Sequence, residues 1–350
     1  MKGKIKIIFV AQDSGGFNAI LPVIKKLKRR KEFISKTILA NQSRDIAKKY
    51  RISYLDGNLL TNKDLKRLLE NNRPSLIFTA TSQGLSIEKR IAKIAKVQKI
   101  KTIALIDFWS NYKFRFSDPG TENLIYLPDY ILAIDEIMKK EMITQGFDSK
   151  KIIITGSPFF DSFLKITKEK QSKKIISFFS QFFSELLKKE HKTYPGFNEI
   201  QVFEDFIKTL EALQVKLPIK IKFHPKTKRL SKFNRIIRNS KLKISIETKL
   251  SSEDLIKKSK LVLGMNSVVL FEAAMIGKPV VSYQPGLNRP DPLISNRVGL
   301  SRAVYQKRNL YSTLEKMLLT KAKKKNLKLI KKYIRNKSTD KVINFIEKQI

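Results

Sequence analysis

A single acid stands in an otherwise apolar helical stretch of the sequence, LVLGMNSVVLFEAAMIGKPVV, which runs from residue 261 to 281. A strand ends at Gly264, a helix begins at Asn266 and Ser267, and the acid is Glu272. Free N–H groups at the start of a helix, aligned with its dipole, favour an anion such as a diphosphate. Glu272 lies about 8 Å further along the helix, roughly the distance from a phosphate to the hydroxyls of a ribose. The segment therefore predicts one helix that holds both halves of a nucleotide.

A histidine at the end of another predicted strand, in IKIKFHPKTKR, could act on the same ligand. The strand ends at Phe223, after Lys222, which is a further candidate for binding the nucleotide, and Pro225 directs the chain out of the sheet. His224 therefore lies at a strand end, where its imidazole could donate to a phosphate or sugar oxygen. A purely structural histidine is the alternative. The other histidine, His191, is expected at the surface.

A glycine turn near the N-terminus offers a second place for a ligand. In FVAQDSGGFNAIL a strand ends at Ala11, and Ser14, Gly15 and Gly16 form a tight turn before a helix that starts near Phe17. Without side chains, the two glycines allow a phosphate, a sugar or an acceptor to come close. An ordinary structural turn is equally consistent with the pattern. The segment is neither G-x-G-x-x-G nor a P-loop, so it predicts neither dinucleotide nor ATP binding of those kinds.

An aromatic loop, IDFWSNYKFRFSDPG at residues 106–120, holds the only tryptophan of the chain. Loops this aromatic either pack on the body of the protein or cover a ligand. An aromatic face beside carboxylates suits a sugar ring, so Trp109 and Arg115 are predicted to contact an acceptor, with packing alone as the alternative. For a general base we choose Asp107, at the strand end, with Asp13 as the second choice.

Two sets of short apolar, β-branched runs carry these candidates, one between residues 5 and 156 and the other between residues 174 and 283. Amphipathic helical stretches separate the runs, a pattern typical of parallel sheets covered on both faces. We therefore predict two Rossmann-like α/β domains, at residues 1–160 and 161–325, followed by a C-terminal helix at 326–350. Ligands bind at the carboxyl ends of strands in such sheets, so the expected site is a cleft between the domains.

The composition excludes several kinds of chemistry. The 350 residues include no cysteine and two histidines, which rules out disulfides, thiolate nucleophiles and Cys-ligated zinc and makes a multi-histidine metal site improbable. We expect no bound metal and no cofactor. No apolar run reaches the roughly 20 residues of a membrane span, and no signal peptide is recognisable, so a cytoplasmic protein is expected.

The formal net charge of +41 raises the question of a polyanionic partner. No Arg-rich or aromatic-interleaved nucleic-acid module is visible, so we expect no nucleic acid. Peripheral attraction to an anionic inner-membrane surface is compatible with the charge. Codon bias of an AT-rich genome is the simpler explanation, because Lys, Ile and Asn are abundant throughout the chain.

Short motifs in both halves resemble GT-B-fold glycosyltransferases and their relatives. GMNSVVLFEAAMIGKPVV is similar to their donor-nucleotide segment, and KFHP to the His-Pro motif of bacterial capsule polysaccharide transferases, including polysialyltransferase-like and glycerophosphotransferase-like proteins. ITGSPFFD, ending at Asp161, resembles the segment that joins the two domains. The resemblance implies that Asn266, Ser267 and Glu272 hold a nucleotide-activated donor, that FFSQ adds Ser180 and Gln181 to its pocket, and that the C-terminal helices return to the first domain.

Nucleotide-sugar 2-epimerases share part of this pattern. They usually show a double acid in the donor helix and an Asp after the fourth strand, whereas here Ala273 follows Glu272 and the corresponding strand ends in TATSQG. We therefore predict a metal-independent glycosyltransferase that moves a sugar from a nucleotide-activated donor to a surface polysaccharide or glycolipid acceptor. A nucleotide-sugar epimerase or hydrolase of the same fold, and an inactive nucleotide-sugar-binding protein, are the alternatives.

Overall fold

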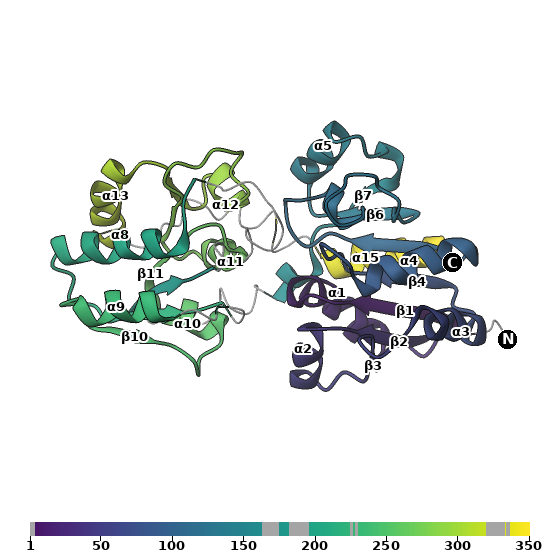
Figure 1. Ribbon diagram of the computed structural model, residues 1–350. Helices are drawn as coiled ribbons and strands as arrows, with labels where there is room; N and C mark the ends of the chain where they lie inside the picture. The colour runs from purple at the N-terminus through teal and green to yellow at the C-terminus, as the bar shows by residue number, and fades with distance from the viewer. Residues whose placement is uncertain are drawn as a thin grey trace. The chain divides into compact units, whose positions relative to one another are not determined.

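The structure of the protein is a computed structural model that describes residues 4–162, 175–181, 196–224, 227, 230–319, 333 and 337–350. The chain divides into two compact units, Met1–Ser162 with Lys332–Ile350, and Phe163–Lys331. Each unit contains one parallel sheet flanked by helices (Figure 1). The predicted fold class of two Rossmann-like domains is confirmed, and the cleft between them stays a prediction. His191 and residues 326–332 and 334–336 of the predicted C-terminal helix lie outside the described residues.

The first sheet has seven strands in the order β3-β2-β1-β4-β5-β6-β7. Its strands are β1 (Ile5–Ala11), β2 (Phe33–Leu39), β3 (Leu55–Asp56), β4 (Leu76–Thr79), β5 (Thr102–Leu105), β6 (Tyr130–Ala133) and β7 (Ile152–Ile154). Its helices are α1 (Ser14–Leu27), α2 (Ser43–Lys49), α3 (Asn62–Asn72), α4 (Ile87–Val97), α5 (Glu136–Thr144) and α15 (Ser338–Gln349), with 3-10 turns η1 (Lys113–Arg115), η2 (Ser149–Lys151) and η3 (Pro158–Ser162). The strand order reverses between β1 and β4, which makes their carboxyl ends a topological switch point.

Alternation along β1 explains how the sheet buries both faces. Ile7 and Phe9 pack in one core cluster with residues of α1 and α15, whereas Ile8 and Val10 pack in another with residues of α3 and α4. Successive side chains of a strand point to opposite faces, so a nearly continuous apolar strand requires a helix layer on each side. The helices that follow β1 and β4 therefore lie on opposite faces of the sheet.

The second sheet repeats this arrangement with six strands in the order β10-β9-β8-β11-β12-β13. Its strands are β8 (Ile175–Phe179), β9 (Ile219–Lys222), β10 (Ile244–Ile246), β11 (Ser259–Gly264), β12 (Val280–Tyr283) and β13 (Arg302–Val304). The helices described in this unit are α8 (Glu199–Ala212), α9 (Ser231–Asn239), α10 (Ser252–Lys258), α11 (Val268–Met275), α12 (Ile294–Arg297) and α13 (Leu310–Leu319), with the turn η4 (Lys307–Asn309). The switch point of this sheet lies between β8 and β11.

Two details of the structure differ from the sequence-based expectations. The edge strands β3 and β13 have two and three residues, too short for a recognisable hydrophobic pattern. Helix α1 begins at Ser14 with Asp13 at its N-cap, so Gly15 and Gly16 belong to its first turn and do not form a separate turn before it.

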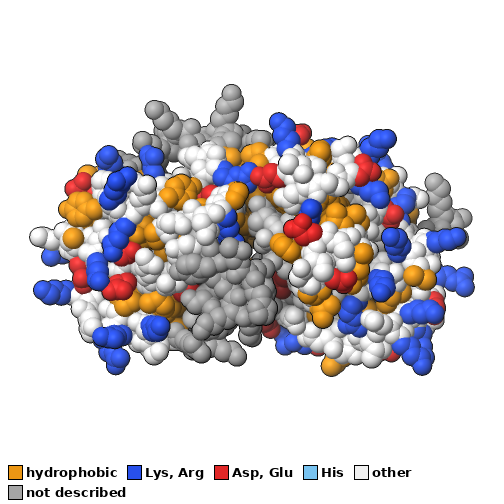
Figure 2. Space-filling model, turned by 45° about the horizontal axis from the view of Figure 1, so that its top comes forward, with side chains coloured by type: hydrophobic (Ala, Val, Ile, Leu, Met, Phe, Trp, Pro, Cys, Tyr) orange, Lys and Arg blue, Asp and Glu red, His pale blue; other side chains and the backbone are white. Residues whose placement is uncertain are grey.

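The surface of the described residues is strongly basic. Figure 2 shows Lys and Arg side chains dispersed over the visible face, with Asp and Glu between them, and not gathered in one patch. No helix in the described part of the chain combines the length and the apolarity needed to span a membrane.

The C-terminal helix α15 is attached to the first unit by a carboxylate from η3. Asp161 Oδ1 accepts from Ser338 N (3.1 Å), and its Oδ2 accepts from Thr339 N (2.8 Å) and from the Thr339 hydroxyl (2.6 Å). The N-cap residue of α15, Lys337, makes no side-chain cap. Asp161 therefore satisfies the first amides of α15 from elsewhere in the chain (α15 is yellow in Figure 1, among the elements of the first unit).

We expect Asp161→Ala to lower the free energy of unfolding by about 1–2 kcal/mol, the usual value of an N-cap. Urea denaturation measures the change. The control is Asp340→Ala, a substitution on the same helix α15. It removes an exposed ion pair with Lys26 of α1 and should cost at most about 1 kcal/mol. Equal effects of the two substitutions would contradict the capping role of Asp161.

Candidate functional site

The first turn of α1 lies very close to the neighbouring strand ends of the first sheet. A Cβ added at Gly16 would lie 2.8 Å from Ala80 Cβ, just beyond β4. A Cβ added at Gly15 would lie 2.6 Å from Asp107 Oδ2, just beyond β5. The two predicted glycines are therefore required by close packing, and they bring the start of α1 against the carboxylate chosen as the general base.

Asp107 is held by Arg115, another predicted residue. Arg115 Nη1 donates to Asp107 Oδ1 (2.7 Å) and to the hydroxyl of Thr81 (2.8 Å). Only 7% of the Arg115 surface is exposed, so this ion pair is shielded from water. The guanidinium fixes the orientation of the carboxylate, and it joins the loop after β5 to the end of β4.

Glu88, near the start of α4, is an acid of this region that was not predicted. It is 4% exposed, and its Oε1 accepts from Gln12 N (2.9 Å) and from the Ser82 hydroxyl (2.8 Å). Burial raises the pKa of Glu88 to about 7, and the charge of Asp13 adds to the rise. The sequence did contain a signal, because Glu88, Ile91 and Ala95 have the i, i+3, i+7 spacing of a buried helix stripe.

The aromatic loop packs into the first unit. Trp109 is 2% exposed and stacks on Phe160, with ring centroids 6.2 Å apart. Its indole N–H donates to Asp135 Oδ1 (2.9 Å), while the Tyr333 hydroxyl donates to Asp135 Oδ2 (3.1 Å). The loop therefore connects β5, α5 and the C-terminal part of the chain. Asp107 is the residue of this loop that lies just beyond the end of β5.

In the second unit, the structure brings two predicted residues together at the switch point. The Gln181 side chain, after β8, donates to Asn266 Oδ1 (2.9 Å) and accepts from Asn266 N (3.0 Å). Asn266 follows β11 and is 7% exposed. Ser267 is the N-cap of α11, and its hydroxyl accepts from Val269 N (3.3 Å). The ends of β8 and β11 are thus fixed to each other directly before the start of α11.

Glu272 is a partly buried acid on α11. Among the described residues, no hydrogen bond or ion pair engages its carboxylate. Burial raises the pKa of Glu272 to about 7, and repulsion from Glu253 on α10 contributes. A carboxylate without a partner in such a position has unused capacity to accept hydrogen bonds from a ligand.

The remaining predicted residues lie at or near the same strand ends. His224 follows β9, and its carbonyl accepts from Thr227 N (2.8 Å). The ammonium of Lys222 donates to Leu250 O (2.6 Å), and the Ser180 hydroxyl donates to Gln181 O (3.2 Å). A Cβ at Gly264 would lie 2.8 Å from Leu270 Cδ1, so this glycine allows α11 to fold back closely on β11.

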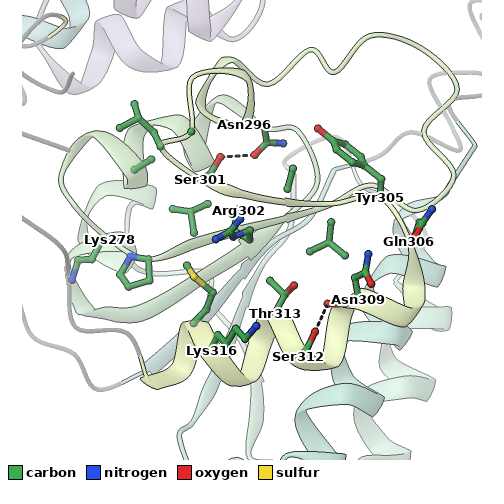
Figure 3. A pocket seen from close by; sticks show the side chains of 18 of the residues that line it. Lys278, Asn296, Ser301, Arg302, Tyr305, Gln306, Asn309, Ser312, Thr313 and Lys316 are labelled. Carbon is green, nitrogen blue, oxygen red and sulfur yellow. Dashed lines mark hydrogen bonds between the residues drawn. The ribbon is translucent and has the colours of Figure 1, made fainter. Parts of the chain in front are cut away.

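A separate cavity of about 1060 Å³ runs along the edge strand β13. Figure 3 shows Arg302 of β13 near its centre, with Asn309 contributed by η4 and Ser312, Thr313 and Lys316 by α13. None of the residues predicted from the sequence lines it. We assign the candidate site to the switch-point residues of each sheet, because the acids and the helix starts are found there.

The geometry can be compared with known proteins. The family model described as UDP-N-acetylglucosamine 2-epimerase matches residues 126–347, well over half of the chain. A search of curated proteins found no match.

Solved structures share the fold over the full length. The UDP-GlcNAc 2-epimerase of Methanocaldococcus jannaschii has 17% identity and a TM-score of 0.71, covering 98% of this chain and 99% of its own. That of Neisseria meningitidis, bound to UDP-GlcNAc, has 16% identity and a TM-score of 0.67, covering 98% of this chain and 100% of its own. The glycotransferase of kitacinnamycin has 13% identity and a TM-score of 0.61, with full coverage of both chains. The resemblance to the GT-B superfamily is thereby confirmed at the level of the fold.

The contact between Gly15 and Asp107 gives a double-mutant test. We expect Gly15→Ala to lower the free energy of unfolding by about 1 kcal/mol, because the new methyl group displaces a carboxylate held by Arg115. In an Asp107→Ala background the same substitution should raise stability by roughly 0.5–1 kcal/mol, the ordinary gain of Ala over Gly in a helix. Chemical denaturation of the four proteins measures the coupling, and simple additivity would contradict the close contact.

Proposed function

The chain belongs to the UDP-N-acetylglucosamine 2-epimerase family, and we propose that it binds a UDP-activated N-acetyl sugar and inverts the configuration at C2 without any acceptor. The observation that supports this most directly is the family match over residues 126–347, which includes α11 with Glu272 and the strand end at His224. The nucleotide would be held by the second unit, through Asn266, Ser267 and Glu272.

The glycosyltransferase predicted from the sequence is therefore wrong, and the epimerase alternative is the better reading. The prediction relied on the absence of an acid directly after the fourth strand and of a second acid beside Glu272. Both enzyme classes need the same contacts to a nucleotide, so the motifs for nucleotide binding could not separate them. With transfer excluded, no acceptor is proposed for Trp109, Arg115 or the α1 glycines.

The reaction itself defines the groups that the site must contain. C2 of an N-acetyl sugar nucleotide is not next to a carbonyl group, so the electron pair of the C2–H bond needs the neighbouring C1–O bond as its acceptor. Breaking both bonds forms a C1=C2 double bond and releases the diphosphate; adding the diphosphate back to C1 and a proton to the other face of C2 completes the inversion. Two proton carriers and a grip on a leaving diphosphate are required.

Residues of this chain can be assigned to those roles. Asp107, oriented by Arg115, is proposed as the proton carrier that first removes the C2 proton. The backbone amides at the start of α11, with His224, would hold the departing diphosphate. The Glu272 carboxylate, which no hydrogen bond or ion pair engages among the described residues, would accept hydrogen bonds from the ribose hydroxyls.

Three finer points remain predictions. They are the identity of the sugar, a role of the product in surface polysaccharide biosynthesis, and a cytoplasmic location with contact to the inner membrane surface.

We expect the affinity for UDP to rise between about pH 6 and pH 8, because ribose hydroxyls bind the ionised form of Glu272, whose pKa is about 7. Glu272→Gln should weaken UDP binding by roughly 10-fold or more at pH 8 and remove this part of the pH dependence. Isothermal titration at several pH values measures both effects.

Glu253→Gln is the matched control for the UDP experiment. It removes the repulsion on Glu272 without touching the proposed contacts, so the pH midpoint should move to lower pH while the affinity at pH 8 is kept. A UDP affinity that is insensitive to Glu272→Gln at every pH argues against the ribose contact.

Incubation with UDP-GlcNAc alone in D2O should give the C2 epimer, with deuterium at C2 in both sugars, as followed by NMR. Asp107→Asn is expected to reduce turnover by about 100-fold or more while UDP binding is retained. Asp56→Asn, which alters another Asp–Arg pair of the first unit, should leave turnover within about twofold. Release of UDP with neither the epimer nor deuterium exchange would overturn the epimerase proposal.

A further inference from the structure

The cavity along the edge strand of the second unit has no role in the reaction outlined above. Its volume is about 1060 Å³, and β13, α13 and the segment between α11 and β12 contribute to its lining. A volume of this size lies at the upper end of the range found for small-molecule sites and far exceeds a single inorganic ion. We call this space, which follows residues 301–306, the β13 cavity (Figure 3).

The β13 cavity follows the outer edge of the second sheet. β13 is the last strand in the order of that sheet, and every residue from 301 to 306 lines the cavity. Successive side chains of a strand point to opposite faces, so a lining without gaps means that the cavity runs along the strand edge and not over one face. The outer backbone N–H and C=O groups of such an edge face no further strand and can bond to a ligand.

The opposite wall of the cavity is one face of a helix. Asn309 of η4 and Ser312, Thr313 and Lys316 of α13 line it at the i, i+3, i+4 and i+7 spacing of a helix face. Leu314 of the same helix is buried in the core cluster of the second unit. Packing of α13 against the core therefore determines which of its side chains meet the cavity.

The charges around the β13 cavity favour an anion. Its described lining includes Arg302, Lys316 and Lys278 and no acid. Lys278 is 3% exposed, and its ammonium donates to the carbonyls of Lys257 (2.6 Å) and Ser259 (2.8 Å), so it contributes only its charge. Arg302 is exposed near the centre of the cavity (Figure 3), and within the described part of the chain no hydrogen bond or ion pair engages its guanidinium. A guanidinium can bind a phosphate or a carboxylate through two parallel hydrogen bonds.

An acid outside the lining, Asp291, is bonded to two of the lining residues. Its Oδ2 accepts from the Tyr305 hydroxyl (2.7 Å) and from the Asn296 amide (2.7 Å). Its Oδ1 accepts from the Gln284 amide (3.0 Å) and from Leu293 N (2.8 Å). Four donors therefore share the charge of Asp291, which reduces its repulsion of an anion in the cavity.

Two polar side chains of the α13 wall can bond to hydroxyl groups of a ligand. Among the described residues, neither the side-chain amide of Asn309 nor the hydroxyl of Thr313 takes part in a hydrogen bond, and both line the cavity (Figure 3). Each group can donate and accept, as the hydroxyls of a sugar also do. An anion that carries hydroxyl groups therefore matches this lining better than a bare inorganic ion or an apolar molecule.

We propose that the β13 cavity binds a sugar that carries a phosphate or a carboxylate group. Arg302 holds the anionic group, and Asn309 and Thr313 bond to the sugar hydroxyls. The cavity reaches Gly277, just after the end of α11, whereas the nucleotide is proposed to bind at the start of this eight-residue helix, about 12 Å away along its axis. The anionic sugar therefore binds in addition to the nucleotide and not in its place.

Isothermal titration of the full-length protein with four probes tests the proposal. The probes are glucose 6-phosphate, glucuronate, glucose and inorganic phosphate. We expect saturable binding of at least one of the two anionic sugars, which identifies the preferred anionic group, and roughly 10-fold weaker binding or none for glucose and for inorganic phosphate. The proposal is overturned if neither anionic sugar binds, or if glucose or inorganic phosphate binds as tightly as they do.

Substitutions in the cavity show whether the anionic sugar binds there. Arg302→Gln should weaken its binding by about 10-fold or more, and Thr313→Val, which keeps the shape of the side chain, by about 3-fold or more. The matched control is Arg238→Gln on α9, because Arg238 is also exposed but does not line the cavity. It should leave the affinity unchanged. Wild-type affinity in Arg302→Gln, or an equal loss in Arg238→Gln, would contradict the assignment.

This test does not depend on the proposed epimerisation. The anionic sugar should bind equally well in the presence of saturating UDP and to Glu272→Gln, because the two sites lie at opposite ends of α11. Competition between UDP and the anionic sugar would place both in the nucleotide site, so the inference would fail while the proposed function stands. If the wild type does not epimerise but Arg302→Gln abolishes binding of the anionic sugar, the proposed function fails and the inference stands.

Discussion

The reversal of strand order in each sheet is the constraint on which the rest of the structure depends. At a switch point, the helices that follow two adjacent parallel strands pass to opposite faces of the sheet, so neither helix covers the space beyond the two strand ends. In the first unit this space lies beyond β1 and β4, and in the second beyond β8 and β11. Side-chain contacts border both spaces. In the first unit they are made by Glu88 and Asp107 with the segment after β1, and in the second unit by Gln181 with Asn266.

Desolvation then determines what the acids near these two places can do. Glu88 and Glu272 both have a pKa near 7 because burial disfavours the charged form. Their surroundings differ, however. Glu88 is bonded through one oxygen to two parts of the first unit, whereas Glu272 is engaged by no hydrogen bond or ion pair among the described residues. The first arrangement suits an acid that acts through its neighbours, and the second suits one that meets a ligand directly.

The sequence predicted the fold well because buried parallel strands leave a strong signal. The two sets of apolar runs contain the strands of the described residues, apart from the short edge strands β3 and β13, which were not recognised. The helix with Asn266, Ser267 and Glu272 was also recognisable, because small polar residues before an apolar run mark a helix start. The family resemblance placed Gln181 in one pocket with Asn266, and the structure joins them by two hydrogen bonds. The contact between Glu88 and Gln12 was not recognisable, because no motif connects these two segments.

The wrong prediction of the reaction class has the same origin. An acid was sought directly after the fourth strand, where the chain has Thr81 and Ser82, and its absence was taken as evidence against proton chemistry on the sugar. In the structure the Ser82 hydroxyl donates to Glu88, so a carboxyl group reaches this sheet edge from the following helix. A reaction needs a carboxyl group at one position relative to the substrate. In a parallel sheet with its helices, residues from several different sequence positions can bring a carboxyl group there. The position of an acid within a motif is therefore weaker evidence about chemistry than the position of its oxygens at the switch point.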